Sequence, residues 1–262
     1  MSPTIEYVLF DLDGGMPARL PSKSNLRPGL LIDTEAIYTT VTNTILAPYG
    51  KEMTWDIKAG CMGKPGHDSA VYLLSCFPDI PLTAADFLAQ CATLQEALWR
   101  TTKLLPGAAR LLAHLAAHGV PLALATSSRR RHFELKTAHL ADAFAAFAGR
   151  VVCSDDARYA MRGKPAPDIF LAAAREVLGR DVGAAEGEAT PAQCGERAKG
   201  LVFEDALFGV QAGKRAGMSV VWIPDDKLLD VEYSGVEKAD QTLKSLEEFV
   251  PEEWGLPPYA AA

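Results

Sequence analysis

The sequence predicts an α/β protein with a parallel sheet, and three features of the chain support this fold class. After residue 105, short apolar runs alternate with helical patterns, as they do in consecutive β-α units. Near the start, an apolar run at 7–10 ends in two aspartates, Asp11 and Asp13. From about residue 34 to about residue 103 the sequence lacks the alternation of β-strands, so this stretch is expected to be helical.

The expected elements follow this pattern along the chain. Short apolar segments predict strands at residues 7–10, 120–125, 150–153, 201–203 and 219–223. Helical periodicity predicts helices at 106–118, 167–178 and 210–216. Proline lies at or near the start of the first two helices and glycine follows all three, which are usual positions for both residues. The segment 181–200 is rich in Ala, Gly and Glu and is expected to be a surface loop.

The composition is that of an ordinary globular protein. The 262 residues are 48% hydrophobic and 23% charged, which allows one domain and a smaller second one. The net charge of −7 argues against a nucleic-acid partner. With no secretory pattern and no run that could span a membrane, a cytoplasmic protein without a membrane partner is expected, as a monomer or weak dimer. Five cysteines without a C-x-x-C pair favour reduced thiols over disulfides or a zinc site.

Asp11 and Asp13 are the first candidates for chemistry. Open α/β sheets bind ligands at the carboxyl ends of their strands, so both carboxylates are expected at that edge. Two carboxylates this close repel each other unless a positive charge lies between them. Mg²⁺ suits such a site because it takes hard oxygen ligands and few protein groups. A calcium loop is a poorer match, since the third acidic ligand and the closing glutamate are missing.

Three further polar motifs follow in a fixed order. Thr126, Ser127 and Ser128 come after an apolar run, and Lys164 lies in a Gly-Lys-Pro string. Glu204 and Asp205 end another apolar run, with Gly209 following. The four motifs in this order resemble those of the haloacid dehalogenase-like hydrolase superfamily. A closer resemblance, over nearly the whole chain, is to its pseudouridine-5'-phosphatase group, and is carried by residues 31–35, 55–58, 62–64, 124–128, 163–165, 203–206 and 255–257.

This resemblance implies a Rossmann-like core at residues 1–33 and 104–262, with a helical cap inserted at 34–103. It implies a Mg²⁺-dependent phosphatase that acts on a small phosphorylated metabolite through an aspartyl phosphate, with pseudouridine 5'-phosphate or a related nucleotide or sugar phosphate as substrate. Asp11 is the implied nucleophile. Asp13 is the implied general acid, and then the general base for water.

The remaining motifs would bind the metal and the phosphoryl group. The implied Mg²⁺ ligands are Asp11, Asp13 and Asp205, with Glu204 holding a metal-bound water. Lys164 would offset the repulsion between the nucleophile and the anionic ester.

The hydroxyl of Thr126 and the backbone amides after it, in Ser127 and Ser128, would contact the phosphoryl oxygens. Lys64 lies in a cap loop that resembles the loop touching substrate in capped relatives, and is a candidate for substrate binding.

One segment departs from the family pattern. Residues 15–29 separate the first motif from the string that contains Asp33 and Thr34, and in relatives that string follows the motif directly. The segment contains three prolines and no acidic residue, so it is expected to be a loop, either a tolerated insertion or a retained intron. A catalytically impaired homologue that binds phosphate ligands is one alternative function. The other is a sugar phosphomutase, which Tyr38 disfavours because such enzymes carry a histidine at the matching place.

Overall fold

A computed structural model of the chain describes residues 4–14, 30–61, 66–224 and 235–260. Its main sheet is parallel throughout, with the strand order β5-β4-β1-β6-β7-β8. These strands are β1 (Tyr7–Phe10), β4 (Leu122–Thr126), β5 (Val151–Cys153), β6 (Gly200–Glu204), β7 (Ser219–Trp222) and β8 (Gln241–Thr242). In β1, Phe10 pairs with Leu124 on one side and with Phe203 on the other. The polar residues after β1, β4 and β6 therefore meet at one edge.

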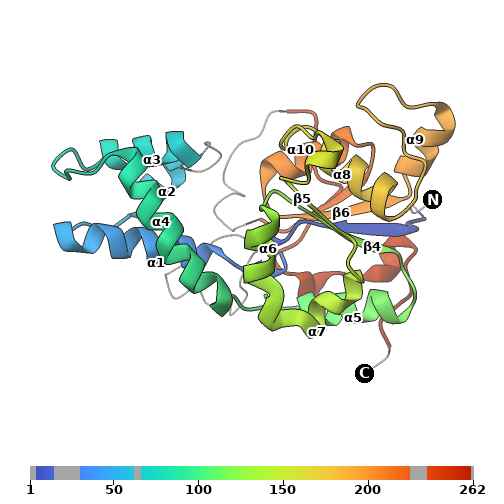
Figure 1. The fold of residues 1–262 in the computed structure, drawn as a ribbon. Helices are drawn as coiled ribbons and strands as arrows, with labels where there is room; N and C mark the ends of the chain where they lie inside the picture. The colour runs from blue at the N-terminus through green and yellow to red at the C-terminus, as the bar shows by residue number, and fades with distance from the viewer. Residues whose placement is uncertain (1–3, 15–29, 62–65, 225–234, 261–262) are drawn as a thin grey trace.

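Helices cover both faces of this sheet (Figure 1). On one side lie α5 (Ala108–Ala117) and α7 (Ala141–Phe144), and on the other lie α8 (Asp168–Ala172) and α10 (Leu207–Arg215). A π-helical turn, Ala173–Val177, extends α8. The side chains of β1 alternate between the two layers: Val8 and Phe10 belong to the core on the α5 side, and Tyr7 and Leu9 to the core on the α8 side. All four are fully buried, so β1 is central to both cores.

A group of helices between β3 and β4 forms a separate cap beside the sheet (Figure 1). These are α1 (Glu35–Leu46), α2 (Trp55–Cys61), α3 (Gly66–Ser75) and α4 (Ala84–Leu98), followed by a 3₁₀ turn at Trp99–Thr101, and they share a core of their own. None of the helices within the described ranges is long and apolar enough to cross a membrane.

The chain enters the cap after Asp33 and leaves it before Leu105, and these two connections lie next to each other. The Asp33 N–H donates to the Lys103 carbonyl, and the Leu105 N–H donates to the Leu31 carbonyl, both at 2.9 Å. The predicted fold class, a parallel-sheet core with an inserted helical cap, is confirmed. The residue boundaries given above for the cap and the core stay a prediction.

The predicted strands and helices are present, and their ends differ by at most three residues when the π-helical turn Ala173–Val177 is counted with α8. The prediction of a surface loop at 181–200 was wrong in part, because α9 (Pro191–Arg197) forms within this segment. Thr190 and Gln193 make a capping box in which each side chain binds the backbone N–H of the other, and Pro191 lies in the first turn. This local start signal outweighs the loop-like composition of the segment.

The segment 15–29 lies outside the described residues, but the residues on both sides of it are described. β2 (Asp13–Gly14) and β3 (Ile32–Asp33) pair in a small parallel sheet of their own. A Cβ atom on Gly14 would lie 2.8 Å from the backbone nitrogen of Leu30, which is fully buried. The two ends that flank the segment are therefore neighbours in space.

Candidate active site

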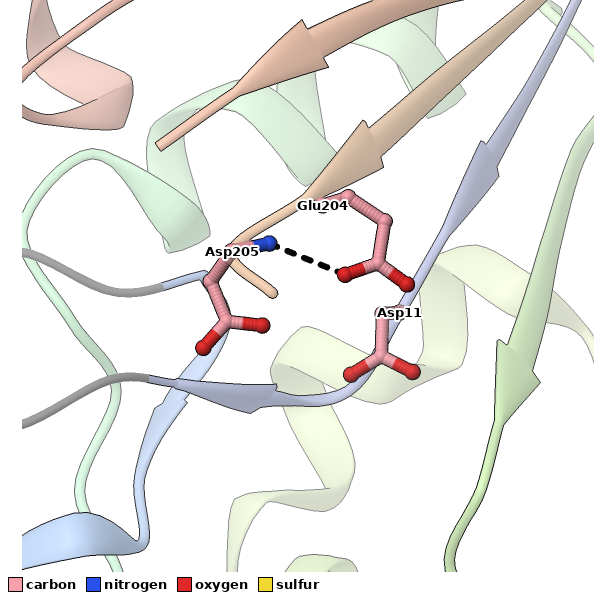
Figure 2. Close-up of side chains that lie close together, drawn as sticks. All are labelled: Asp11, Glu204 and Asp205. Atoms are coloured by element: carbon pink, nitrogen blue, oxygen red, sulfur yellow. Dashed lines mark hydrogen bonds between the residues drawn. The ribbon is translucent and has the colours of Figure 1, made fainter. Parts of the chain in front are cut away.

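The predicted site residues gather at the carboxyl edge of the sheet. Asp11 follows β1, while Thr126 and Glu204 end the neighbouring strands β4 and β6. Figure 2 shows the carboxylates of Asp11, Glu204 and Asp205 grouped around one region at this edge. Lys164 reaches the same region from the segment before α8. The parallel topology thus assembles residues that are far apart in the sequence.

Lys164 binds two of these carboxylates at once. Its Nζ lies 2.6 Å from Asp11 Oδ1 and 2.6 Å from Glu204 Oε1. All three side chains are less than a tenth exposed. Desolvation alone would lower the pKa of Lys164, but the two carboxylates outweigh it and raise that pKa, so the ammonium group stays charged. The two contacts are charge-assisted hydrogen bonds, which are stronger than neutral ones.

Glu204 is held by several groups. Its Oε2 accepts the N–H of Asp205 at 3.0 Å and of Ala206 at 3.2 Å, while Oε1 binds Lys164. A Cβ atom on Gly209 of α10 would lie 1.8 Å from this carboxyl group, so any side chain there would have to displace Glu204. Burial raises the pKa of Glu204 to about 7, against the lowering effect of Lys164. Both oxygens already accept hydrogen bonds, so Glu204 would contact a metal through a water molecule rather than directly.

The carboxylate of Asp205 forms no salt bridge with the residues that the structure describes. Its backbone carbonyl accepts a hydrogen bond from Trp222 Nε1 at 2.8 Å, which fixes the start of the loop after β6. Burial, and then the charges of Glu204 and Asp11, raise the pKa of Asp205 well above its ordinary value. A cation bound here would remove that repulsion.

The donor set fits a hard divalent cation. Asp11, Glu204 and Asp205 each offer an oxygen, and these oxygens lie within 4.8 Å of one another. Oxygens on opposite sides of a Mg²⁺ ion are about 4.2 Å apart, so little adjustment is needed. Carboxylates without cysteine or histidine favour Mg²⁺ over zinc. Among the described residues, this cluster and Asp13 supply four carboxylates against two lysine ammonium groups, so one divalent cation would balance the remaining negative charge.

Asp13 has partners of its own. Lys136, in α6 (Arg130–Thr137), places Nζ 2.6 Å from Asp13 Oδ1, and Ser128 Oγ donates to Oδ2 at 2.8 Å. Burial alone would raise the pKa of Asp13, but the charge of Lys136 and the hydrogen bonds from both partners hold it below the usual value. The sequence did not single out Lys136, because nothing distinguishes it locally from the other basic residues of its helix.

The remaining candidates occupy the loop after β4. Thr126 is fully buried, and its Oγ1 accepts the N–H of Ser128 at 3.0 Å, which closes a tight turn at the edge of the sheet. Ser127 is exposed at the tip of this turn. The turn brings the Ser128 side chain to Asp13, as described above. Lys64 lies outside the described residues.

The cap adds polar residues near Asp13 that the sequence had not assigned to the site. Lys58 Nζ in α2 lies 3.2 Å from Glu35 Oε2 and donates to Thr39 Oγ1 at 2.6 Å, both in α1. Burial is the main cause of the raised pKa of Glu35, with Lys58 opposing it and Asp13 adding to it. Burial and then Asp13 likewise raise the pKa of Tyr38. Glu35 and Tyr38 are therefore within electrostatic range of Asp13.

Comparisons with known proteins agree with this geometry. The family model for haloacid dehalogenase-like hydrolases matches residues 29–217. The mitochondrial (DL)-glycerol-3-phosphatase 1 of Arabidopsis thaliana is 40% identical over 257 residues, which cover 98% of this chain and 75% of that one. A probable pseudouridine-5'-phosphatase of Drosophila melanogaster is 40% identical over 231 residues, covering 88% of this chain and 92% of that one.

A solved structure shows the same fold. A haloacid dehalogenase family hydrolase of Deinococcus radiodurans, with bound phosphate and sodium, superposes with a TM-score of 0.71 at 25% identity. The match covers 98% of this chain and 99% of that one. The resemblance predicted from the sequence is confirmed by these relatives. The chain therefore belongs to the haloacid dehalogenase-like hydrolases, and within that family it is a phosphoric monoester hydrolase.

Proposed function

We propose that the protein is a Mg²⁺-dependent phosphatase that cleaves a small phosphate monoester through an aspartyl phosphate on Asp11. The observation that carries this proposal is the contact of Lys164 with Asp11 and Glu204, beside the carboxylate of Asp205. A phosphate monoester is an anion, and a carboxylate nucleophile would repel it. A buried ammonium 2.6 Å from the nucleophile offsets that repulsion where it is strongest.

In the first step, an oxygen of Asp11 attacks phosphorus and the bond from phosphorus to the ester oxygen breaks. Asp13 takes up a proton before this step and donates it to the departing oxygen, so that an alcohol leaves. The nucleophile is already oriented, since Oδ2 of Asp11 accepts the Asp13 N–H at 3.0 Å and Oδ1 binds Lys164. This fixed orientation lowers the entropic part of the barrier.

In the second step, water attacks the phosphorus of the aspartyl phosphate, Asp13 takes a proton from it, and inorganic phosphate leaves with Asp11 restored. Thr126 uses its Oγ1 as an acceptor for Ser128, so its hydroxyl hydrogen is free to donate to a phosphoryl oxygen. Asp11, Asp205 and the Asp13 carbonyl would hold Mg²⁺. When bound, the ion supplies positive charge that stabilises the phosphoryl oxygens during transfer.

The proposed substrate is pseudouridine 5'-phosphate. The similarity to the Drosophila relative supports it. Glycerol 3-phosphate is a second candidate, favoured by the Arabidopsis relative that covers nearly the whole chain. In the cap, Glu35 lies within electrostatic range of Asp13 and pairs with Lys58, and the two offer an acceptor and a donor for the hydroxyl groups of either candidate substrate. A ribose and a glycerol both carry neighbouring hydroxyls, so the two substrates differ mainly in the size of the group under the cap.

Phosphate release by the purified protein with Mg²⁺ tests this proposal. The substrates are pseudouridine 5'-phosphate, uridine 5'-phosphate and glycerol 3-phosphate, with 4-nitrophenyl phosphate as a generic ester. We expect kcat/KM to be highest for pseudouridine 5'-phosphate. A higher value for glycerol 3-phosphate would support the second candidate, and no release from any ester would support the impaired homologue.

The absence of a histidine at position 38 disfavours a sugar phosphomutase. The residue at the place of the mutase histidine is Tyr38, whose ring lies 5.2 Å from that of Trp99 in an edge-to-face contact. Incubation with β-glucose 1-phosphate should therefore give no glucose 6-phosphate. The cytoplasmic location and the monomeric or weakly dimeric state stay predictions.

A further inference from the structure

We propose that Lys136 is a positioning residue that aims the carboxylate of Asp13 and ties its orientation to the connection between the cap and the sheet. This inference rests on the proposed function, in which Asp13 exchanges protons with the leaving group and with water. A carboxyl group can do so only when one of its oxygens lies within hydrogen-bond reach of the reacting oxygen. The orientation of Asp13 therefore affects the rates of both steps.

Each oxygen of Asp13 has its own donor. Lys136 Nζ lies 2.6 Å from Oδ1, and Ser128 Oγ lies 2.8 Å from Oδ2. The two donors also contact each other, since Nζ donates to Ser128 Oγ at 2.9 Å. Lysine is almost never fully buried unless it is paired, and Lys136 is only 1% exposed. The three groups form a closed triangle that fixes the rotation of the Asp13 side chain.

Lys136 also contacts the return connection of the cap in two places. Its ammonium lies 4.4 Å from the centre of the Trp99 ring, which is a cation–π contact. Its backbone carbonyl accepts a hydrogen bond from Thr102 Oγ1 at 2.6 Å. Trp99 and Thr102 are both buried, at the last turn of the cap and just after it. A shift of the cap connection would therefore reach Asp13 through Lys136.

A positioning role can be separated from simple neutralisation of a buried charge by varying the leaving group. 4-Nitrophenolate is a stable anion that departs with little help from an acid, whereas phenolate needs more protonation. The two aryl phosphates have nearly the same size and charge, so binding affects them alike. A defect in proton donation by Asp13 should therefore slow phenyl phosphate more than 4-nitrophenyl phosphate.

The experiment compares kcat/KM for both esters in wild-type protein and in Lys136→Met. We expect Lys136→Met to lower kcat/KM for phenyl phosphate about tenfold more than kcat/KM for 4-nitrophenyl phosphate. General acid catalysis contributes about a hundredfold or more, and a misaimed Asp13 would lose part of that contribution. Arg131→Met is the matched control, because it also removes a cation from α6. The side chain of Arg131 is 72% exposed and pairs with Glu96. That variant should change both rates little and by the same factor.

A second comparison keeps the test valid if Lys136→Met alone does not fold. The double variant Asp13→Asn, Lys136→Met removes both charges together, so no buried charge is left unpaired. If Lys136 acts through Asp13, the double variant and Asp13→Asn should have kcat/KM values within about twofold of each other. Two independent residues would instead multiply their losses.

The possible failures can be told apart. Equal losses on the two esters in Lys136→Met, or a further tenfold loss in the Asp13→Asn background, would overturn the positioning role of Lys136. If the wild-type protein releases phosphate from neither ester, or if Asp13→Asn slows both esters equally, the proposed function of Asp13 is wrong instead.

Discussion

The carboxyl group of Glu204 occupies the space that a side chain at Gly209 would need. A Cβ atom there would lie 1.8 Å from that carboxyl group, which Lys164 and two backbone amides hold in place. We expect Gly209→Ala to push Glu204 away from Lys164 and to lower kcat/KM for phosphate release more than tenfold, since displacements of about 1 Å can cost about a hundredfold. Overpacking should also destabilise the fold by about 1–3 kcal/mol, measured by chemical denaturation.

Gly195 provides the control for that substitution. It lies in the exposed helix α9, and a Cβ atom there would meet nothing within 4 Å. Gly195→Ala should leave kcat/KM unchanged and stabilise the protein by about 0.5–1 kcal/mol, through the better helix propensity of alanine. If Gly209→Ala behaves like this control, Glu204 is not held as the structure indicates.

Asp11→Asn is expected to abolish turnover and to leave the fold intact. The amide keeps the shape of the carboxylate but removes the nucleophilic oxygen and one negative charge from the cluster. Circular dichroism and the melting temperature should therefore stay close to those of the wild type, while phosphate release falls below a tenth of its value. Asp156→Asn is a suitable comparison, because Asp156 binds Arg130 and the Cys153 N–H rather than the cluster. Retention of a tenth or more of the activity by the Asp11 variant would rule out Asp11 as the nucleophile.

Mg²⁺ is expected to be required for activity and to raise the melting temperature. The carboxylates of Asp11, Glu204 and Asp205 repel one another, and a bound ion would relieve that repulsion only in the folded chain. At a concentration a hundred times its Kd, a ligand stabilises the folded state by about 2.7 kcal/mol. For a domain of this size that corresponds to a shift of several degrees. EDTA should abolish activity and the shift together, and Ca²⁺ should restore activity poorly because its coordination is larger and looser.

Asp205→Asn tests the same site without an activity assay. Because Asp205 pairs with no cation among the described residues, removing its charge should raise the melting temperature in EDTA by a few degrees. The same variant should lose the additional stabilisation by Mg²⁺. A metal-dependent shift of unchanged size would contradict the assignment of Asp205 as a ligand.

The site residues that the sequence predicted share one property, which is that local motifs carry them. Asp11 and Glu204 each follow a short apolar run, and Lys164 lies in a distinctive string before a helix. Lys136 has no such motif. Its contact with Asp13 joins residues 123 positions apart and arises only when α6 packs against the 3₁₀ turn Trp99–Thr101, so tertiary structure alone reveals it.

Deleting residues 15–29 should leave phosphate release unchanged or raise it, and should raise the melting temperature. Gly14 and Leu30 are neighbours in space, so joining them should leave the pairing of β2 with β3 in place. Ordering a long loop costs conformational entropy that few buried contacts could offset. The junction also lies next to Asp13, whose position must hold closely for proton transfer.

Two variants besides the wild type decide the matter: the deletion, and a replacement of residues 15–29 by a Gly/Ser linker of equal length. If the segment is a tolerated insertion or a retained intron, the deletion should be at least as active and more stable than the wild type. The linker variant should then match the wild type in activity. It keeps the length of the segment but none of its side chains, which a tolerated insertion would not need. An inactive or less stable deletion, together with an inactive linker variant, would show that these residues contribute specific contacts to the site.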